Sequence, residues 1–282
     1  MTIKNSCINW YGGKGSTQQR NLLKIIINYI NKSDKLIFVD VFGGSGIVTL
    51  NVQDKIKKYN DINKDLINFF EVLKDKKLSM ELQDRLYKTL YCKLIYEEAC
   101  EELTSGQYKI KDLNRAVNFY IATMQSINSI GALQKSGFRS SKSHLRKGMG
   151  QAVSAWKTNI DKNLPIVIDE FRKVEVYNYD FLDCINKFDS KNTIFYLDPP
   201  YILESRKNKK VYTDELEDRR HQELIEKILT IKGDAILSGY ENNIYTELEE
   251  KGWNKEIINI KSPSTPRGAK TSRKECIWYN FT

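Results

Sequence analysis

The sequence predicts an α/β fold, in which a Rossmann-like, doubly wound and mainly parallel sheet is interrupted by a helical segment. Short apolar runs typical of buried strands alternate with amphipathic stretches typical of helices over residues 17–73 and again over 174–238. Between about 71 and 171 the helical patterns follow one another without a strand. Two final runs, 255–260 and 275–281, flank a basic loop and predict a terminal antiparallel hairpin.

Each element of the amino-terminal part follows from its apolar spacing. Residues 17–31 predict a helix, because large aliphatic side chains recur on one side: Leu22, Leu23, Ile26, Ile27 and Ile30. A buried strand at 36–41 leads into a glycine-rich turn at 43–46 and a short helix near 48–52. A second strand, 56–59, is followed by a helix from 64 to about 73.

After the insert the same alternation returns. We expect strands at 174–177, 193–197 and 235–238, with helices near 180–187 and 214–231. Within the insert, one predicted helix covers 113–127. The sequence therefore predicts a sheet domain formed by residues 1–70 and 172–282, and a helical domain formed by residues 71–171.

Length and composition narrow the class of protein. A chain of 282 residues suffices for one substantial α/β domain and a smaller one. No segment approaches the roughly 18 uncharged apolar residues of a membrane span, and the first residues do not form a secretory signal. The five cysteines are scattered, and none forms a C-x-x-C pair, which favours a reducing cytoplasm. With only two histidines, we predict no metal site.

The positive charge indicates a polyanionic partner. The net charge is +9, although an AT-rich genome would also enrich lysine. Three basic runs stand out, at 135–157, 206–210 and 261–274, and we interpret them as loops. One such run is usually a solvated face, but three favour contacts with nucleic acid phosphates. The residues that we assign to DNA binding are Lys135, Arg139, Lys142, Arg146, Lys209 and Lys270.

The most informative turn follows the strand at 193–197 and consists of Asp198, Pro199, Pro200 and Tyr201. The two prolines forbid continuation as strand or helix, so a stiff turn is expected at a strand end, where open α/β sheets bind ligands. Asp198 and the Pro199 carbonyl can each accept one hydrogen of an exocyclic amine, and Tyr201 can stack on the planar base. Such a turn can also be a purely structural stop.

A second candidate site lies where the first strand meets its helix. The glycines at 43–46 let a ligand approach the backbone, and Asp40 can bind polar groups of a nucleoside or an amino acid. Asp61 ends the next strand, where nucleotide-binding α/β folds place a carboxylate on ribose hydroxyls. An ordinary tight turn is the alternative for the glycines. Asp61 could instead cap a helix, although Asn63 could take that role.

Three motifs occur in a fixed order along the chain: Trp10-Tyr11-Gly12-Gly13-Lys14, Asp40-Val41-Phe42-Gly43-Gly44-Ser45-Gly46, and the turn at Asp198. In this order the chain resembles the Dam-like, alpha-group family of DNA adenine N6-methyltransferases, from residue 9 to about residue 280. The resemblance implies S-adenosylmethionine as methyl donor, S-adenosylhomocysteine as product, and no metal. It also implies transfer to N6 of a flipped-out adenine in double-stranded DNA.

The resemblance also assigns residues. Catalysis falls to Asp198, Pro199, Pro200 and Tyr201. With Asp40, the cofactor site comprises Trp10, Gly12, Gly13, Lys14, Phe42, Gly44, Gly46, Asp61, Asp180 and Phe181. We expect the helical insert to recognise the target sequence. The stretch 129–139 differs from its counterpart in members that methylate GATC, so the recognition sequence is not implied.

Two alternatives remain. The same chemistry could act on cytosine N4, RNA adenine or a protein glutamine; Asp198 weighs against the first and third, whose enzymes mostly carry Ser or Asn there. The other alternative is a non-catalytic DNA-binding protein with a decayed methylase fold, against which the intact motifs weigh. We expect a cytoplasmic monomer, bacterial or phage-encoded, without membrane association. A cognate restriction endonuclease is one candidate partner.

Overall fold

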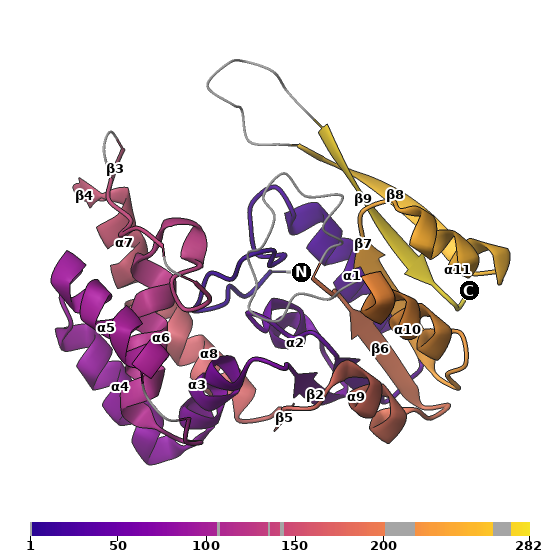
Figure 1. The fold of residues 1–282 in the computed structure, drawn as a ribbon, viewed down its shortest axis with the longest axis horizontal. Coiled ribbons are helices and arrows are strands. Elements are labelled where there is room, and N and C mark those ends of the chain that lie inside the picture. The colour runs from indigo at the N-terminus through magenta and orange to yellow at the C-terminus, as the bar shows by residue number, and fades with distance from the viewer. Residues whose placement is uncertain (1, 106–107, 135, 142–143, 201–217, 262–271) are drawn as a thin grey trace.

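The computed structural model describes residues 2–105, 108–134, 136–141, 144–200, 218–261 and 272–282. A helical lobe lies beside a twisted sheet that carries helices on both faces (Figure 1). No helix within these ranges is long and apolar enough to span a bilayer.

Seven strands form one sheet in the order β5-β2-β1-β6-β7-β9-β8. The first five strands run parallel, and β9 pairs antiparallel with both β7 and β8. This topology confirms the predicted doubly wound sheet with a terminal hairpin. The strands are β1 (Ile37–Asp40), β2 (Ile56–Asn60), β5 (Glu175–Tyr177), β6 (Thr193–Leu197), β7 (Asp234–Gly239), β8 (Asn254–Lys261) and β9 (Ser272–Tyr279).

The central strands β1 and β6 flank the point where the chain reverses its direction across the sheet. From β1 the chain proceeds to β2 and β5 on one side, and then to β6 and β7 on the other. Open α/β sheets bind ligands at this switch point, outside the carboxyl ends of the strands. Asp40 ends β1 and lies in register with Tyr196, two residues before Asp198. Both carboxylates therefore lie at the switch point.

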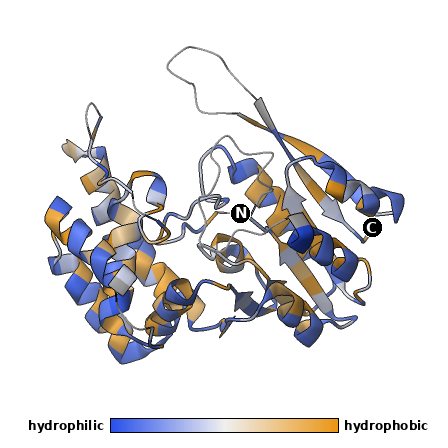
Figure 2. Ribbon diagram, viewed as in Figure 1, coloured by the Kyte–Doolittle hydropathy of each residue, from blue (hydrophilic) through white to orange (hydrophobic). Residues whose placement is uncertain are grey.

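Helices cover both faces of the sheet. One face packs against α9 (Phe181–Phe188), α10 (Asp218–Ile228) and α11 (Thr246–Glu250), and the other against α1 (Arg20–Lys32) and α2 (Ile47–Asn51). Successive residues of a strand point to opposite faces, so Phe38 joins the α1 layer and Val39 the α9 layer. Many of the helices are hydrophobic on one side and hydrophilic on the other (Figure 2).

The helical lobe has its own apolar core, which continues into the sheet. The helical lobe consists of α3 to α8 with the short helical segments η1 (Ile127–Ser129) and η2 (Asn159–Asn163). Phe70 stacks on Phe171 with ring centres 4.0 Å apart, and both contact Tyr59 of β2. The helices are α3 (Lys64–Lys74), α4 (Lys76–Lys88), α5 (Lys93–Ser105), α6 (Leu113–Gln125), α7 (Gln151–Thr158) and α8 (Leu164–Phe171).

The prediction of an insert without strands is wrong. Two short strands, β3 (Leu145–Arg146) and β4 (Met149–Gly150), pair antiparallel within it. The two residues between them, Lys147 and Gly148, have φ angles of 55° and 72°. Two positive φ angles in a two-residue loop are typical of the hairpin turn whose twist matches its strands. The Lys147-Gly148 pair is the signal that sequence reasoning missed.

The interpretation of the basic runs as loops is also wrong in part. Lys157 lies in α7, which forms because Ala152 and Trp156 are buried on one side, and its ammonium pairs with Asp161 at 3.3 Å. The third run extends the hairpin, since Lys261 ends β8 and Lys274 belongs to β9. Backbone pairing with β8 extends β9 into this segment, where Ser272 pairs with Lys261.

Candidate functional site

Asp198 receives two hydrogen bonds on one of its two oxygens. Lys14 Nζ lies 2.7 Å from Asp198 Oδ1, and Ser238 Oγ donates to the same oxygen at 2.9 Å. No residue in the described ranges hydrogen-bonds to Oδ2, and the side chain is 16% exposed. Lys14 comes from the amino-terminal turn and Ser238 from the end of β7. Segments far apart in the sequence thus fix the carboxylate through one of its oxygens.

The two donors are themselves supported from behind. Lys14 is 1% exposed, and its Nζ lies 3.7 Å from Oε2 of the equally buried Glu275. Burial lowers the pKa of Lys14, but the charges of Asp198 and Glu275 outweigh this effect, so its pKa lies above the usual range. Tyr196 OH lies 3.0 Å from Ser238 Oγ; because Ser238 donates to Asp198, the tyrosine donates here. The network therefore has a single orientation.

Asp40 differs because one of its buried oxygens has no partner. Asp40 is 1% exposed, and its Oδ2 accepts a hydrogen bond from Thr49 Oγ1 at 2.7 Å. Its Oδ1 is buried without a hydrogen-bond partner in the part of the chain that the structure describes. Burial, together with the charges of Asp198 and Asp61, raises the pKa of Asp40 to about 7. A buried acceptor without a donor is costly, and a cationic or N–H group of a ligand would satisfy it.

The glycine turn is held by Asp61. The Gly44 N–H donates to Asp61 Oδ2 at 2.9 Å, and the Asn63 N–H donates to Oδ1. Asn63 caps α3 by accepting from the Leu66 N–H, so the cap belongs to Asn63 and not to Asp61. Gly44 has a φ of +49°, and a Cβ there would lie 2.9 Å from Trp10 Cδ1. The turn therefore requires glycine, and it packs the first motif against the second.

The other residues of these two motifs lie in the same region. The Gly13 N–H donates to the Trp10 carbonyl at 3.0 Å, which closes a turn with Gly12 at a φ of +75°. Gly46, at a φ of +69°, precedes the first turn of α2. The Phe42 ring centre is 5.7 Å from that of Phe181 at the start of α9.

Asp180 has partners that the sequence did not foresee. Its Oδ1 accepts from the Leu182 N–H and caps α9, and its Oδ2 pairs with the Arg220 guanidinium. The Arg220 guanidinium also lies over the Phe181 ring, 4.4 Å from its centre. Phe42, Phe181 and Arg220 thus form an aromatic and cationic cluster beside the end of β5.

Two of the predicted DNA-binding residues lie in the described part of the helical lobe. The Arg139 N–H donates to the Gln125 carbonyl at 2.7 Å, and its carbonyl accepts from Tyr91 OH, so its backbone is fixed. Arg146 is exposed on β3. Tyr201, Lys135, Lys142, Lys209 and Lys270 lie outside the described residues.

Sequence reasoning missed several residues around Asp198. Ser238 could have been found, because it ends the predicted strand at 235–238. Glu275 carried a weaker signal, as an acid directly after Arg273-Lys274. His221 is entirely buried, and its Nε2 lies 3.0 Å from the Pro200 carbonyl oxygen.

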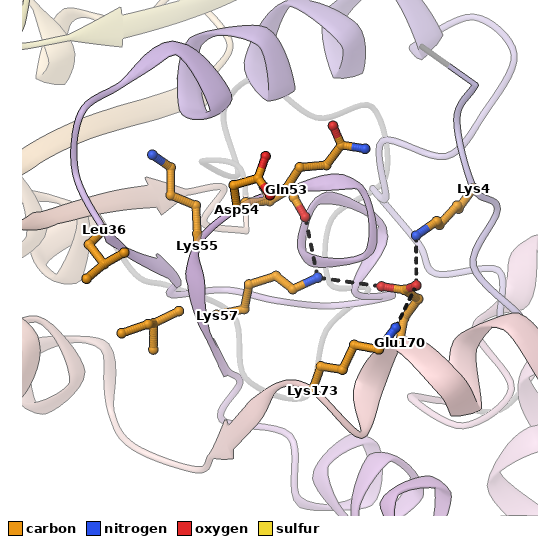
Figure 3. A pocket seen from close by; sticks show the side chains of 10 residues that line it. Lys4, Leu36, Gln53, Asp54, Lys55, Lys57, Glu170 and Lys173 are labelled. Carbon is orange, nitrogen blue, oxygen red and sulfur yellow. Dashed lines mark hydrogen bonds and ion pairs between the residues drawn. The ribbon is translucent and has the colours of Figure 1, made fainter.

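A pocket of about 640 Å³ lies at the opposite end of the sheet (Figure 3). It opens beside the amino ends of β1 and β2, and Glu170 within it pairs with Lys4, Lys57 and Lys173. None of its lining residues belongs to the three motifs. Within the described ranges no group of three or more His, Cys, Asp or Glu side chains could hold a metal ion.

Comparison with solved structures gives weak likenesses. A precorrin-6y C5,15-methyltransferase from Geobacter metallireducens GS-15 is 9% identical with a TM-score of 0.40, covering 98% of both chains. A precorrin 8W decarboxylase from Methanobacterium thermoautotrophicum is 13% identical with a TM-score of 0.38, covering 99% of this chain and 96% of that one. Likenesses of this size carry no argument about chemistry. Comparison with curated proteins found no match.

A family profile gives a more extensive match. The profile described as D12 class N6 adenine-specific DNA methyltransferase matches residues 10–262. This range begins at Trp10 and includes the glycine turn, the helical insert and the turn at Asp198. The match spans most of the chain, which therefore belongs to the D12 class of N6 adenine-specific DNA methyltransferases.

Proposed function

We propose that this DNA methyltransferase uses S-adenosylmethionine to methylate N6 of an adenine flipped out of a specific duplex sequence. One observation carries the proposal: Asp198 directly follows β6 at the switch point with Oδ1 held by Lys14 and Ser238, while its side chain remains partly exposed. An aligned, partly exposed carboxylate whose second oxygen has no partner among the described residues is suited to accept a hydrogen from a substrate amine.

The catalytic role of the turn follows from the chemistry of the amine. The N6 lone pair of adenine is delocalised into the ring, so the planar amine is a poor nucleophile. Asp198 and the Pro199 carbonyl would each accept one of its hydrogens, which favours a tetrahedral nitrogen with its lone pair available for attack. The residues would act by orientation and electrostatics, without a covalent enzyme intermediate.

The carboxylates at the other strand ends fit the proposed methyl donor. Asp40 would receive a cationic or N–H group on its unpartnered Oδ1, and Asp61 would bind ribose hydroxyls beside Gly44. Phe42, Phe181 and Asp180 would bind the adenine of the cofactor. When bound, the donor supplies a methyl group on a sulfonium and leaves as S-adenosylhomocysteine.

The DNA must deliver its base to Asp198. Unstacking an adenine costs a few kcal/mol, and stacking on Tyr201 would recover about 1–3 kcal/mol. We assign sequence recognition to the insert of residues 71–171, because it interrupts the catalytic sheet domain and contains the acid-free basic stretch around Arg139. The basic residues of the other runs would bind phosphates. We expect the enzyme to act in a bacterial cytoplasm, as a monomer.

The proposal can be tested on purified protein. Tritiated S-adenosylmethionine is incubated with duplex DNA, single-stranded DNA or structured RNA, and the labelled nucleosides are separated. We expect label in N6-methyldeoxyadenosine from the duplex and little elsewhere. Label in RNA alone would move the substrate to RNA adenine, and the absence of label in every nucleic acid would contradict the proposal.

A further inference from the structure

His221 connects the catalytic turn to the core of the sheet domain. It lies in the first turns of α10 and is entirely buried. Its Nε2 lies 3.0 Å from the Pro200 carbonyl oxygen, and its Nδ1 lies 3.1 Å from Tyr245 OH. Tyr245 is itself 2% exposed, and its ring centre is 4.8 Å from that of the buried Trp278. The histidine thus links a buried aromatic pair to the turn.

The chemistry of these contacts fixes the roles of the two ring nitrogens. A backbone carbonyl can only accept a hydrogen bond, so Nε2 must carry a hydrogen and donate it to Pro200. In the neutral ring Nδ1 is then an acceptor, and Tyr245 OH donates to it. Each of the two contacts therefore has a defined donor and a defined acceptor.

The two anchored points enclose the proposed amine acceptors. At one end of the turn, Lys14 and Ser238 hold Asp198 Oδ1. At the other end, His221 holds the Pro200 carbonyl. The ring of each proline fixes its φ angle, so little rotational freedom remains between the two ends. The Pro199 carbonyl lies between them in the chain, and its position relative to Asp198 depends on both anchors.

We propose that His221 is a positioning residue of the methyl-transfer site, which holds the Pro200 carbonyl so that the Pro199 carbonyl and Asp198 can bind the two amine hydrogens together. This role rests on the function proposed above. His221 does not touch the adenine; it acts through the turn. Tyr245 supports it by holding the ring in the tautomer that donates from Nε2.

The test compares three substitutions at position 221 in the full-length chain. Glutamine places an amide N–H near the position of Nε2, whereas asparagine places one near Nδ1 and leucine places none. We expect His221→Asn and His221→Leu to lower kcat about 10²-fold, since small misplacements of catalytic groups cost this much. His221→Gln should restore most of kcat. KM for duplex DNA and the affinity for S-adenosylmethionine should stay within about threefold of wild type.

Tyr245→Phe and Gln222→Ala complete the design. Tyr245→Phe removes the donor to Nδ1 and should lower kcat by a smaller factor. Gln222→Ala is the matched control on the same helix: it removes a hydrogen bond to Glu247 but none to the turn, and kcat should not change. Thermal unfolding of each variant identifies those that fold. If His221→Leu does not fold, the asparagine and glutamine variants decide.

The outcomes separate this role from the proposed function. If the wild type methylates adenine and Asp198→Ala does not, but all folded His221 variants keep the wild-type kcat, the positioning role is wrong and the function stands. Equal losses in His221→Gln and His221→Asn would also overturn the role, because they would indicate packing only. If the wild type forms no N6-methyladenine, the proposed function and the positioning role are both wrong.

Discussion

Two aspartates at the ends of adjacent parallel strands differ in how completely the protein satisfies them. Asp198, after β6, has Oδ1 held by Lys14 and Ser238 and a side chain that is partly exposed. Asp40, at the end of β1, is buried with Oδ1 unpartnered among the described residues, and its pKa is raised to about 7. The protein itself orients the Asp198 carboxylate. The Asp40 carboxylate can still accept a hydrogen-bond donor or a cation, which a ligand would supply.

This difference indicates that the two strand ends at the switch point have different functions, one in catalysis and one in binding. A catalytic acceptor benefits from a fixed orientation before the substrate arrives, since no reorganisation is then needed during the reaction. A binding carboxylate can remain unsatisfied, because a ligand that supplies the missing donor gains the whole interaction. We therefore assign the β6 end to the adenine amine and the β1 end to the cofactor.

Among changes near the end of β6, we expect Lys14→Met to cause the largest loss in the free energy of unfolding. This change removes the cation that pairs with both Asp198 and the buried Glu275, and breaking a buried pair in this way costs about 3–5 kcal/mol. Urea denaturation should show a loss of that size. The double variant with Glu275→Gln should recover part of it. A loss below about 1 kcal/mol would contradict a buried ion pair between Lys14 and Glu275, because only exposed pairs are worth so little.

The β1 end is tested through the turn that lies beside it. Gly44→Val forces a β-branched residue to a φ of +49° and into contact with Trp10. Asp61→Ala leaves the Gly44 N–H without its acceptor. We expect both variants to weaken S-adenosylmethionine binding by about 10- to 100-fold in calorimetry. Unchanged affinity in both would place the cofactor elsewhere.

We expect the preferred methylation sequence to be independent of the residues at the ends of β1 and β6. Arg139→Ala is expected to relax the preferred methylation sequence, because a bidentate contact with guanine is worth about 1–3 kcal/mol of discrimination. Lys209→Ala and Lys270→Ala should instead weaken binding to every sequence and flatten its salt dependence. Methylation profiles on a random-sequence library distinguish these effects. If Arg139→Ala keeps the wild-type profile, the arginine contacts only phosphate.

The smallest effect is a pH dependence from Asp40. Its raised pKa keeps the carboxyl protonated below about pH 7, and a cationic ligand group favours the carboxylate. Binding should therefore release a proton, and affinity should rise about tenfold from about pH 6 to its plateau above about pH 7. Asp40→Asn should abolish this rise. A wild-type affinity that is flat over this range would contradict the assignment of Asp40 to the cofactor.

The same titration affects folding with a defined sign. The unfolded chain ionises this carboxyl near about pH 4, whereas the folded protein holds the proton up to about pH 7. Asp40 therefore lowers the free energy of unfolding as the pH rises through this window. Asp40→Asn should remove that contribution, which urea denaturation at the two pH values would detect.

The sheet could be predicted from sequence because its signals are local. The run 193–197 consists of β-branched, aromatic and aliphatic residues, is buried throughout and forms β6 with the same bounds, and the five predicted residues of α1 are all buried. The insert was harder, since its β3–β4 ribbon depends on two positive φ angles at Lys147 and Gly148. Gly148 is a signal for such a turn, but a lysine rarely adopts a positive φ angle, so the pair was not recognised as a hairpin turn.

In the candidate site, too, residues with a local sequence signal could be predicted, whereas residues that meet only in the fold were harder to identify. Its motif residues could be identified because they are contiguous, as at Asp198-Pro199-Pro200. Of the residues that support them, Ser238 ends a predicted strand and could have been identified. Glu275 and His221 could not, because Glu275 contacts Lys14 from β9 and His221 contacts the Pro200 carbonyl from α10. These contacts exist only once the sheet order is known. Asp61 illustrates the limit: its contact with Gly44 was visible only in the fold.

One measurement tests the division between the two aspartates most directly. Cofactor affinity and single-turnover methyl transfer to duplex DNA are measured for wild type, Asp198→Ala and Asp40→Asn, each saturated with S-adenosylmethionine. We expect Asp198→Ala to bind the cofactor normally but to transfer methyl groups on the order of 10³-fold more slowly. Asp40→Asn should bind about tenfold more weakly at pH above 7, yet transfer near the wild-type rate once saturated. Loss of the same step in both variants, or wild-type transfer by Asp198→Ala, would contradict the assignment.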